Sequence, residues 1–301
     1  RDRQNIKSIA IGYQAGFQDQ SGNSIAMGEN AGQKLQDTDA IAIGTAAGRD
    51  NQSFDNIAIG NAAAVSNQAT GSIAIGRSAG RNLQGQTGSF QTRAIAIGHQ
   101  AGFTNQNGQT IAIGSDAGYT GQQSNGISIG NTAGFITQNF NAIAIGASGG
   151  YSNQGADGIA IGQQAGKFDQ NINCIAIGEK AGAKQQGLVG GKGHSIAIGG
   201  GAGRETQGSY AIAIGYSAGY TGQQTNSIIF NASGNEITNS AAAYGGATGV
   251  TGSFLVNPIR NVKNQKYVLY YNPGSTGYNG ATNYEITYDL APTGASGSGP
   301  Q

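Results

Sequence analysis

Residues 143–174 read IAIGASGGYSNQGADG IAIGQQAGKFDQNINC, which is one 16-residue unit written twice. The unit opens with Ile-Ala-Ile-Gly, has a further glycine as its eighth residue and has glutamine as its twelfth. Close copies begin at Ile9, Ile25, Ile41, Ile57, Ile73, Ile95, Ile111, Ile127, Ile143, Ile159, Ile175, Ile196 and Ile212, and a degenerate copy begins at Ile228. Eleven of the thirteen steps are 16 residues long, and the other two are 22 and 21. A register kept over so many copies indicates a folded repeat array.

The unit predicts β structure. Frequent glycine would destabilise a helix, and 16 residues are too few for a two-helix repeat. Ile-Ala-Ile alternates large and small side chains as a strand does, glycine then turns the chain, and a second, polar strand carries the glutamine. Such coils stack into a parallel β-solenoid in which each coil pairs with the next. Fourteen coils, each adding about 4.8 Å, make a rod of roughly 60–65 Å.

The alternation also places both isoleucines on one face of the strand and alanine on the other. We expect the isoleucine face to form the narrow core of each coil. The alanine face would then be a flat apolar stripe along the rod, which an identical neighbour would bury most simply. The sequence therefore predicts an oligomer.

Glutamine stands eleven residues after the first isoleucine in thirteen coils. A primary amide can donate to one neighbouring coil and accept from the other, as in the amide ladders of stacked strands. We expect a structural ladder formed by Gln20, Gln36, Gln52, Gln68, Gln84, Gln106, Gln122, Gln138, Gln154, Gln170, Gln186, Gln207 and Gln223. The single cysteine, Cys174, falls in a column of mostly small residues before the first isoleucine, which predicts a buried thiol.

The motif Ser-Ile-Ala-Ile-Gly-x-x-Ala resembles the head repeat of trimeric autotransporter adhesins, and the resemblance covers residues 8 to about 231. Those heads are left-handed parallel β-rolls that assemble as trimers. The resemblance therefore implies a left-handed roll and a homotrimer. The unit is a couple of residues longer than is common in that family.

The C-terminal part differs in composition. Residues 1–234 form the predicted β-roll, 235–252 an Ala/Gly-rich connector, 253–290 a small β module with short aromatic strands, and 291–301 a flexible tail. A roll followed by such a module is similar to tail-fibre and spike proteins of phages and large DNA viruses. The resemblance implies a fibre that attaches to a host or surface, located on a virion or outside a cell. A bacterial adhesin head is the alternative.

Composition argues against several function classes. Sixteen Lys and Arg against fifteen Asp and Glu leave a formal charge of +1, whereas a nucleic-acid binder needs a basic face. One Cys and two His are too few for a Cys-rich zinc site, and no apolar run is long enough to span a bilayer. We expect no enzyme activity, no cofactor or metal, no nucleic-acid partner and no membrane insertion.

One catalytic alternative is a glycan-degrading spike. Asp39 and Asp55 occupy the same column in consecutive coils and would stack about 5 Å apart, near the carboxylate separation of retaining glycosidases. That column otherwise holds many Asn and Asp residues, which favour turns, so we interpret it as turn chemistry.

The column that lies eight residues after the first isoleucine is aromatic in four consecutive coils. Aromatic faces stack on sugar rings, so this strip is a candidate contact for a host-surface glycan or receptor; the alternative is a ladder of rings packed on one another or on a neighbouring chain. The two insertions, around 82–93 and 184–194, are further candidates because loops on rigid scaffolds often carry recognition. The candidate receptor contacts are Phe90, Arg93, Phe103, Tyr119, Phe135 and Tyr151.

Overall fold

In the computed structural model, the chain is described for residues 4–87, 90–91, 93–239, 252–257, 267–276 and 282–290. The description covers only the backbone for residues 86–87, 90–91, 189, 267–276 and 282–290. The predicted tail, 291–301, and most of the predicted connector, 235–252, lie outside the described residues. The chain divides into two units, Arg1–Asn257 and Pro258–Gln301.

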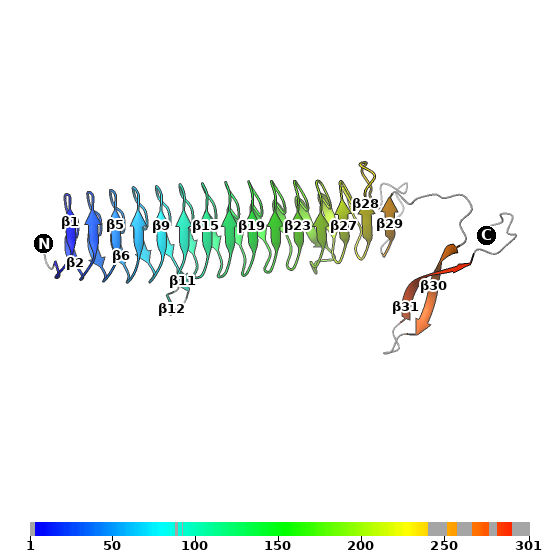
Figure 1. The fold of residues 1–301 in the computed structure, drawn as a ribbon, viewed down its shortest axis with the longest axis horizontal. Coiled ribbons are helices and arrows are strands. Elements are labelled where there is room, and N and C mark those ends of the chain that lie inside the picture. Colours follow the sequence, from blue (N-terminus) through cyan, green and yellow to red (C-terminus); the bar gives the residue numbers. More distant parts are fainter. Residues whose placement is uncertain are drawn as a thin grey trace. The chain divides into compact units, whose positions relative to one another are not determined.

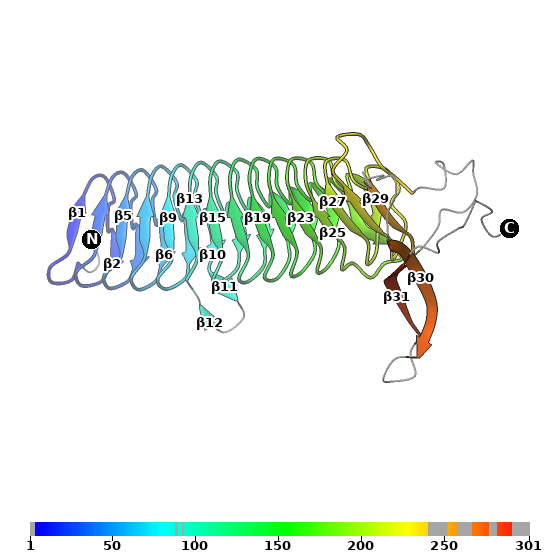
Figure 2. The ribbon, with the colours of Figure 1, turned by 45° about the vertical axis from the view of Figure 1, so that its right-hand side comes forward.

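The first unit is a parallel β-solenoid, which confirms the predicted fold class and the 16-residue coil (Figures 1 and 2). Each regular coil contributes one short strand to each of two parallel sheets. The isoleucine sheet consists of β1 (Ile9–Ile11), β3 (Ile25–Met27), β5 (Ile41–Ile43), β7 (Ile57–Ile59), β9 (Ile73–Ile75), β13 (Ile95–Ile97), β15 (Ile111–Ile113), β17 (Ile127–Ile129), β19 (Ile143–Ile145), β21 (Ile159–Ile161), β23 (Ile175–Ile177), β25 (Ile196–Ile198), β27 (Ile212–Gly215), β28 (Ile228–Asn231) and β29 (Phe254–Asn257).

The glutamine sheet faces it across the core. Its strands are β2 (Gln18–Gln20), β4 (Lys34–Gln36), β6 (Asp50–Gln52), β8 (Ser66–Gln68), β10 (Asn82–Gln84), β14 (Thr104–Gln106), β16 (Thr120–Gln122), β18 (Ile136–Gln138), β20 (Ser152–Gln154), β22 (Phe168–Gln170), β24 (Lys184–Val189) and β26 (Glu205–Gly208). Equivalent residues pair throughout, for example Ile111 with Ile127 and Gln122 with Gln138. A residue in one column therefore stacks on the same column of the next coil.

The core is built from the small side chains, so the predicted orientation of the Ile-Ala-Ile strand is wrong. Ala112, the middle residue of β15, is fully buried, and the alanines of the other strands line the same interior. The isoleucines point outward, and Ile113 is 37% exposed. The apolar stripe on the rod is thus made of isoleucine rather than alanine.

Glutamine explains this inversion. The Gln122 side chain crosses the interior and its Nε2 donates to the carbonyl oxygen of Ile111 on the facing strand, 3.0 Å away. A Cβ placed on Gly118 would lie 2.6 Å from Gln122 Oε1, so the space over this glycine is already filled by the amide. Two sheets separated by one glutamine side chain leave room between them for alanine or serine. Isoleucine fills this position only at Ile229 in β28 (among the described strands), whose coil carries no ladder glutamine.

Glycine also closes the first corner of each coil. Gly114 follows β15 with φ +127°, a conformation that L side chains rarely adopt, and a Cβ there would lie 2.6 Å from the carbonyl oxygen of Gly130 in the next coil. The coils can therefore approach to strand spacing at this corner only without a side chain.

One feature differs from the predicted domain borders. The strand β29 pairs in parallel with β28, so residues 254–257 continue the solenoid rather than begin the C-terminal module. The second unit contains an antiparallel hairpin of β30 (Tyr267–Thr276) and β31 (Thr282–Leu290). The apolar Phe-Leu-Val run of β29 occupies the same alternating positions as Ile228-Ile229-Phe230, which accounts for its place on the sheet.

Candidate functional site

The glutamine ladder runs inside the rod. Its thirteen side chains are each no more than 1% exposed. Gln122 Nε2 lies 3.0 Å from Gln138 Oε1 in the next coil, 2.9 Å from the carbonyl oxygen of Gly126 and 3.0 Å from that of Ile111. These amides bond to neighbouring coils and to the facing sheet at once. They are buried in the core and offer no surface to a ligand.

The ladder is interrupted. The Oε1 atoms of Gln106, Gln170 and Gln207 are buried without a hydrogen-bond partner. Gln106 and Gln207 each follow one of the two insertions, where the preceding glutamine belongs to a coil with a longer turn. Two of these three breaks therefore coincide with the insertions, and the third, at Gln170, lies between coils of ordinary length.

The aromatic strip, Phe103, Tyr119, Phe135 and Tyr151, is a stack of rings. Its three successive centroid distances are 4.9, 4.9 and 5.0 Å, and the interplanar angles are 1°, 19° and 14°. The guanidinium of Arg81 lies over Phe103, 5.6 Å from the ring centroid, and Lys167 lies 6.0 Å from that of Tyr151. Each ring face meets another ring or a cation, so the strip presents mainly ring edges to a ligand.

The first insertion forms a short antiparallel hairpin of β11 (Gln86–Thr87) and β12 (Phe90–Gln91) that projects from the rod (Figure 2). The Phe90 side chain lies outside the described part of the chain. Arg93 is exposed, and its Cγ would lie 3.1 Å from a Cβ on Gly71 of the preceding coil. This insertion leaves the coil after the glutamine strand, whereas the aromatic strip precedes that strand. The structure therefore does not bring these two candidate contacts together.

The second insertion lengthens β24 and stays close to the rod. Ser209 Oγ of the next coil donates to the Gly187 carbonyl oxygen at 2.8 Å and accepts from the Lys192 amide at 3.0 Å. The His194 ring stacks on Tyr210 with a centroid distance of 5.3 Å. These contacts give the insertion a defined surface on the next coil.

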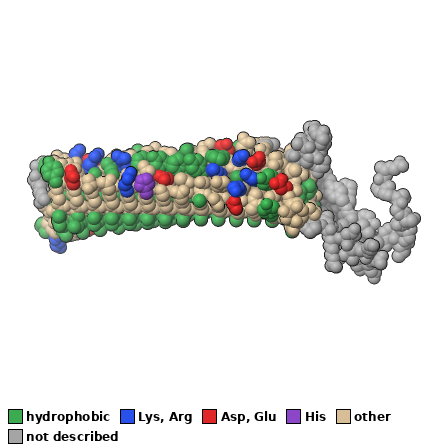
Figure 3. Space-filling view, turned by 90° about the horizontal axis from the view of Figure 1, so that it is seen from above, with side chains coloured by type: hydrophobic (Ala, Val, Ile, Leu, Met, Phe, Trp, Pro, Cys, Tyr) green, Lys and Arg blue, Asp and Glu red, His purple; other side chains and the backbone are tan. Residues whose placement is uncertain are grey.

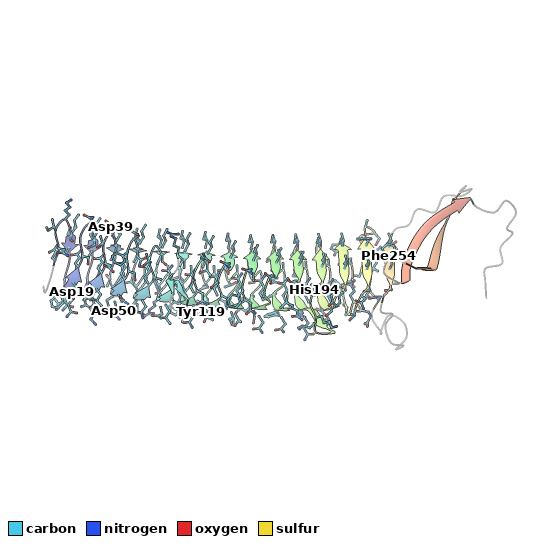
Figure 4. All side chains as sticks on the ribbon, turned by 90° about the horizontal axis from the view of Figure 1, so that it is seen from below. Asp19, Asp39, Asp50, Tyr119, His194 and Phe254 are labelled. Carbon is cyan, nitrogen blue, oxygen red and sulfur yellow. The ribbon has the colours of Figure 1, made fainter. Side chains whose placement is uncertain are left out.

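Asp39 and Asp55 are exposed turn residues. Both have positive φ, 60° and 56°, as does Asn141 in the same column at 56°. Asn and Asp tolerate this left-handed conformation better than most residues, which accounts for their recurrence here. Figure 4 shows Asp39 on the opposite side of the rod from Tyr119.

The isoleucine stripe is an apolar feature that runs along the outer surface of the solenoid. It consists of the first and third residues of every strand in the isoleucine sheet, all isoleucine except Met27, Phe230, Phe254 and Val256. Figure 3 shows it as a continuous hydrophobic row along one side of the rod. No charged or polar side chain interrupts it between β1 and β29.

Cys174 is buried, as its column predicts. Its Sγ lies 3.1 Å from Ser195 Oγ in the next coil. Burial raises the pKa of the Cys174 thiol, and the hydrogen bond with Ser195 opposes this rise only in part. A buried thiol of this kind is a poor nucleophile.

Other site types find little support. Across the described ranges, no three His, Cys, Asp or Glu residues cluster so as to hold a metal ion. In the same ranges, no helix has the length and apolarity needed to cross a membrane. No known family model, no curated protein and no solved structure matches the chain. The geometry itself therefore carries the functional argument.

Proposed function

We propose that this chain is the rod of a trimeric fibre or spike that attaches to a host or surface. The observation that carries the proposal is the isoleucine stripe. Exposed apolar patches of this extent on soluble proteins mark interaction sites. The stripe is flat, regular and uncharged, so the partner that matches it along its whole length is another copy of the same stripe.

The number of chains comes from the resemblance to trimeric adhesin heads. Each rod has one such stripe, and a closed ring of identical copies buries every stripe without leaving a free edge. Three rods around one axis would place the isoleucines inside and the glutamine sheets outside. This inverts the packing expected from the sequence but preserves the predicted oligomer.

Attachment would occur through the outer columns. Interior columns keep the same residue types because every coil packs against its neighbours in the same way. Only the outer columns can vary in residue type from one coil to the next. Three identical outer faces on a stiff rod raise the effective affinity of weak contacts. The virion surface or the outside of a cell is the location that this role implies, with a bacterial adhesin head as the alternative source.

Sedimentation of matched variants tests the assembly. The triple variant Ile97→Asp, Ile113→Asp and Ile161→Asp places charge on the stripe at residues that are 36–37% exposed. The control variant carries aspartate at three apolar residues of the glutamine sheet, Leu35, Leu83 and Ile136, which are 37–54% exposed. We expect a trimer for the wild type and the control, and folded or unfolded monomers for the stripe variant. A wild-type monomer at micromolar concentration, or equal dissociation of both variants, would refute the assembly.

Binding of the rod to host cells or to surface polysaccharides tests attachment. The double variant Tyr119→Ala and Tyr151→Ala removes two rings of the aromatic strip. Deletion of residues 86–91 removes the first hairpin and restores the 16-residue step between Ile73 and Ile95. We expect weaker attachment with the trimer intact. Attachment that is unchanged after both alterations would place recognition elsewhere.

A further inference from the structure

One coil has no side chains at the corner that follows its isoleucine strand. Four and five residues after the first isoleucine, the twelve other complete coils have a side chain at both positions, such as Glu179-Lys180 and Tyr216-Ser217. The coil that begins at Ile196 has Gly200-Gly201 there instead. Two adjacent side chains are therefore missing from an otherwise continuous corner.

The backbone does not require these glycines. The residues equivalent to Gly201 in the other coils have φ between 48° and 58°, none of them is glycine, and Gly201 has φ 67°. A Cβ on Gly200 would lie 3.7 Å from Tyr216 Cδ2, an ordinary contact distance. The effect of the two glycines is thus to open space on the surface.

The space is a hollow of about 200 Å³, which we call the glycine notch. Its walls include Glu179 and Lys180 from the coil before and Arg204 beside the glycines. Tyr216 and Tyr220 come from the coil after, and Glu236 comes from the segment that follows β28. Pockets for drug-sized ligands have volumes of roughly 300–1,000 Å³, so the notch suits a group the size of one sugar ring.

Charged side chains of both signs line the notch, and further cations lie beside it. Eight residues after the first isoleucine, the coil that begins at Ile175 has Ala183, whereas the coils on either side have Lys167 and Arg204. A second, smaller hollow opens over this alanine, and its lining includes Lys167, Lys180, Lys184 and Arg204. Figure 3 shows side chains of both charges close together near the C-terminal end of the rod, and a second group toward its N-terminal end. Only 10% of the chain is charged, so this density is a local feature.

The cations differ in their partners. Lys180 pairs with Glu179 at 2.7 Å and Lys184 with Glu205 at 3.0 Å. Within the described part of the chain, Arg204 forms no ion pair; it donates to the Tyr220 hydroxyl and its guanidinium lies 5.1 Å from the Tyr220 ring centroid. A guanidinium has five N–H donors, so Arg204 retains donors for an anionic ligand.

We propose that the glycine notch binds a carboxylate-bearing sugar residue of a surface glycan. Arg204 would pair with the carboxylate through two parallel N–H bonds, the geometry that guanidinium favours. Tyr216, 59% exposed, offers an apolar ring face to the sugar, and the Glu236 carboxylate accepts from its hydroxyl groups. The inference rests on the proposed attachment function and assigns it a ligand class. Weak binding at each notch would be raised by the three copies on one rod.

Saturation-transfer NMR with the full chain measures binding of glucuronate, N-acetylneuraminate, glucose and inorganic sulfate. We expect at least one acidic sugar to bind, and glucose to bind at least about tenfold more weakly because it lacks the carboxylate. Equal binding of glucose would overturn carboxylate recognition. Sulfate competing as well as the acidic sugar would show a site for anions in general. Absence of binding by both acidic sugars would remove the proposal.

Two matched pairs of variants locate the site. Gly200→Gln restores a side chain over the notch, and Ala147→Gln makes the same addition in the same column of a coil without a notch. Arg204→Gln removes the guanidinium, and Arg81→Gln removes one from the same column that also lies over an aromatic ring. We expect a loss of tenfold or more with each notch variant and no change with either control. Wild-type binding by Gly200→Gln would overturn the site.

Sedimentation of the same samples separates this inference from the proposed function. A trimer that attaches to cells but binds no acidic sugar would remove the notch as a site and leave the attachment function standing. A chain that neither assembles nor attaches would remove the attachment function. Binding of an acidic sugar that is lost on Gly200→Gln would still establish the notch itself.

Discussion

Gln122 and Gln106 are equally buried members of the glutamine ladder, but they make different numbers of hydrogen bonds. Gln122 Nε2 has three acceptors within 3.0 Å. Gln106 Nε2 has one good acceptor, the Ile95 carbonyl oxygen at 2.8 Å, and a second at 3.5 Å, while its Oε1 has no partner. Replacement of each by alanine removes the same atoms from the same kind of site, so the transfer and cavity contributions are similar.

The difference between the two variants therefore measures the hydrogen bonds. One amide nitrogen has two N–H groups, so Gln122 makes two full bonds among its three acceptors, and Gln106 makes about one. A net hydrogen bond contributes about 1 kcal/mol, and a buried partner left without one costs about 1–3 kcal/mol. We expect Gln122→Ala to lower the free energy of unfolding by about 2–3 kcal/mol and Gln106→Ala by about 1–2 kcal/mol.

Urea unfolding followed by far-ultraviolet circular dichroism gives both values from the transition midpoints and slopes. All samples must have one protein concentration, because association would stabilise the folded chain in a concentration-dependent way. Equal destabilisation by the two variants, or a larger effect of Gln106→Ala, would refute the claim that the ladder bonds stabilise the rod. Variants with altered slopes would need hydrogen exchange at single amides instead.

Other residues give shorter tests. Gly114→Ala forces a Cβ to 2.6 Å from backbone and should prevent folding or cost more than about 3 kcal/mol, whereas Gly191→Ala, with nothing within 4 Å, should cost about 1 kcal/mol or less by thermal unfolding. The hydrogen bond and charge of Lys180 hold the pKa of Glu179 below its ordinary value of 4.5. This ion pair is present above that pH and is lost as the pH falls through the lowered pKa, and NMR titration should show the pKa rise in Lys180→Met. Cys174 should resist alkylation at pH 8 until the chain is unfolded, and rapid labelling of the native protein would contradict its buried position.

The period of the sequence predicts the solenoid because a column that recurs every 16 residues must stack on itself. It also places the rings of Phe103 and Tyr119 in adjacent coils, where they lie 4.9 Å apart. Alternation alone divides Ile111 and Ala112 between two faces but does not say which face is inside. Hydrophobicity favours isoleucine inside, whereas the length of Gln122 and the missing Cβ of Gly118 set a spacing that fits small side chains such as Ala112 and Ser128.

The glycine notch depends on a different kind of information. The sequence contains Gly200-Gly201, but a glycine run at a corner also reads as an ordinary turn signal. The equivalent residues of the other coils have similar φ values and carry side chains, so the backbone does not need glycine at this corner. That comparison identifies the two glycines as the cause of the hollow. The position of Glu236 beside the notch could not be predicted, because that residue lies beyond the repeat and no column fixes its place.

Because each residue pairs with the equivalent residue of the next coil, the number of repeats in the gene sets the length of the rod. A duplication of 16 codons would supply a complete set of glycine corners, one more glutamine and one more segment of stripe, and would lengthen the rod by about 4.8 Å without a new kind of contact. A duplication of another length would put every later residue out of register with the coil before it, unless the extra residues formed a loop after the glutamine strand. Both departures from the 16-residue step leave the coil there, and Ile73 still pairs with Ile95 across the longer one. Duplication could therefore change the length of the rod in small equal steps, while surface loops diversify independently.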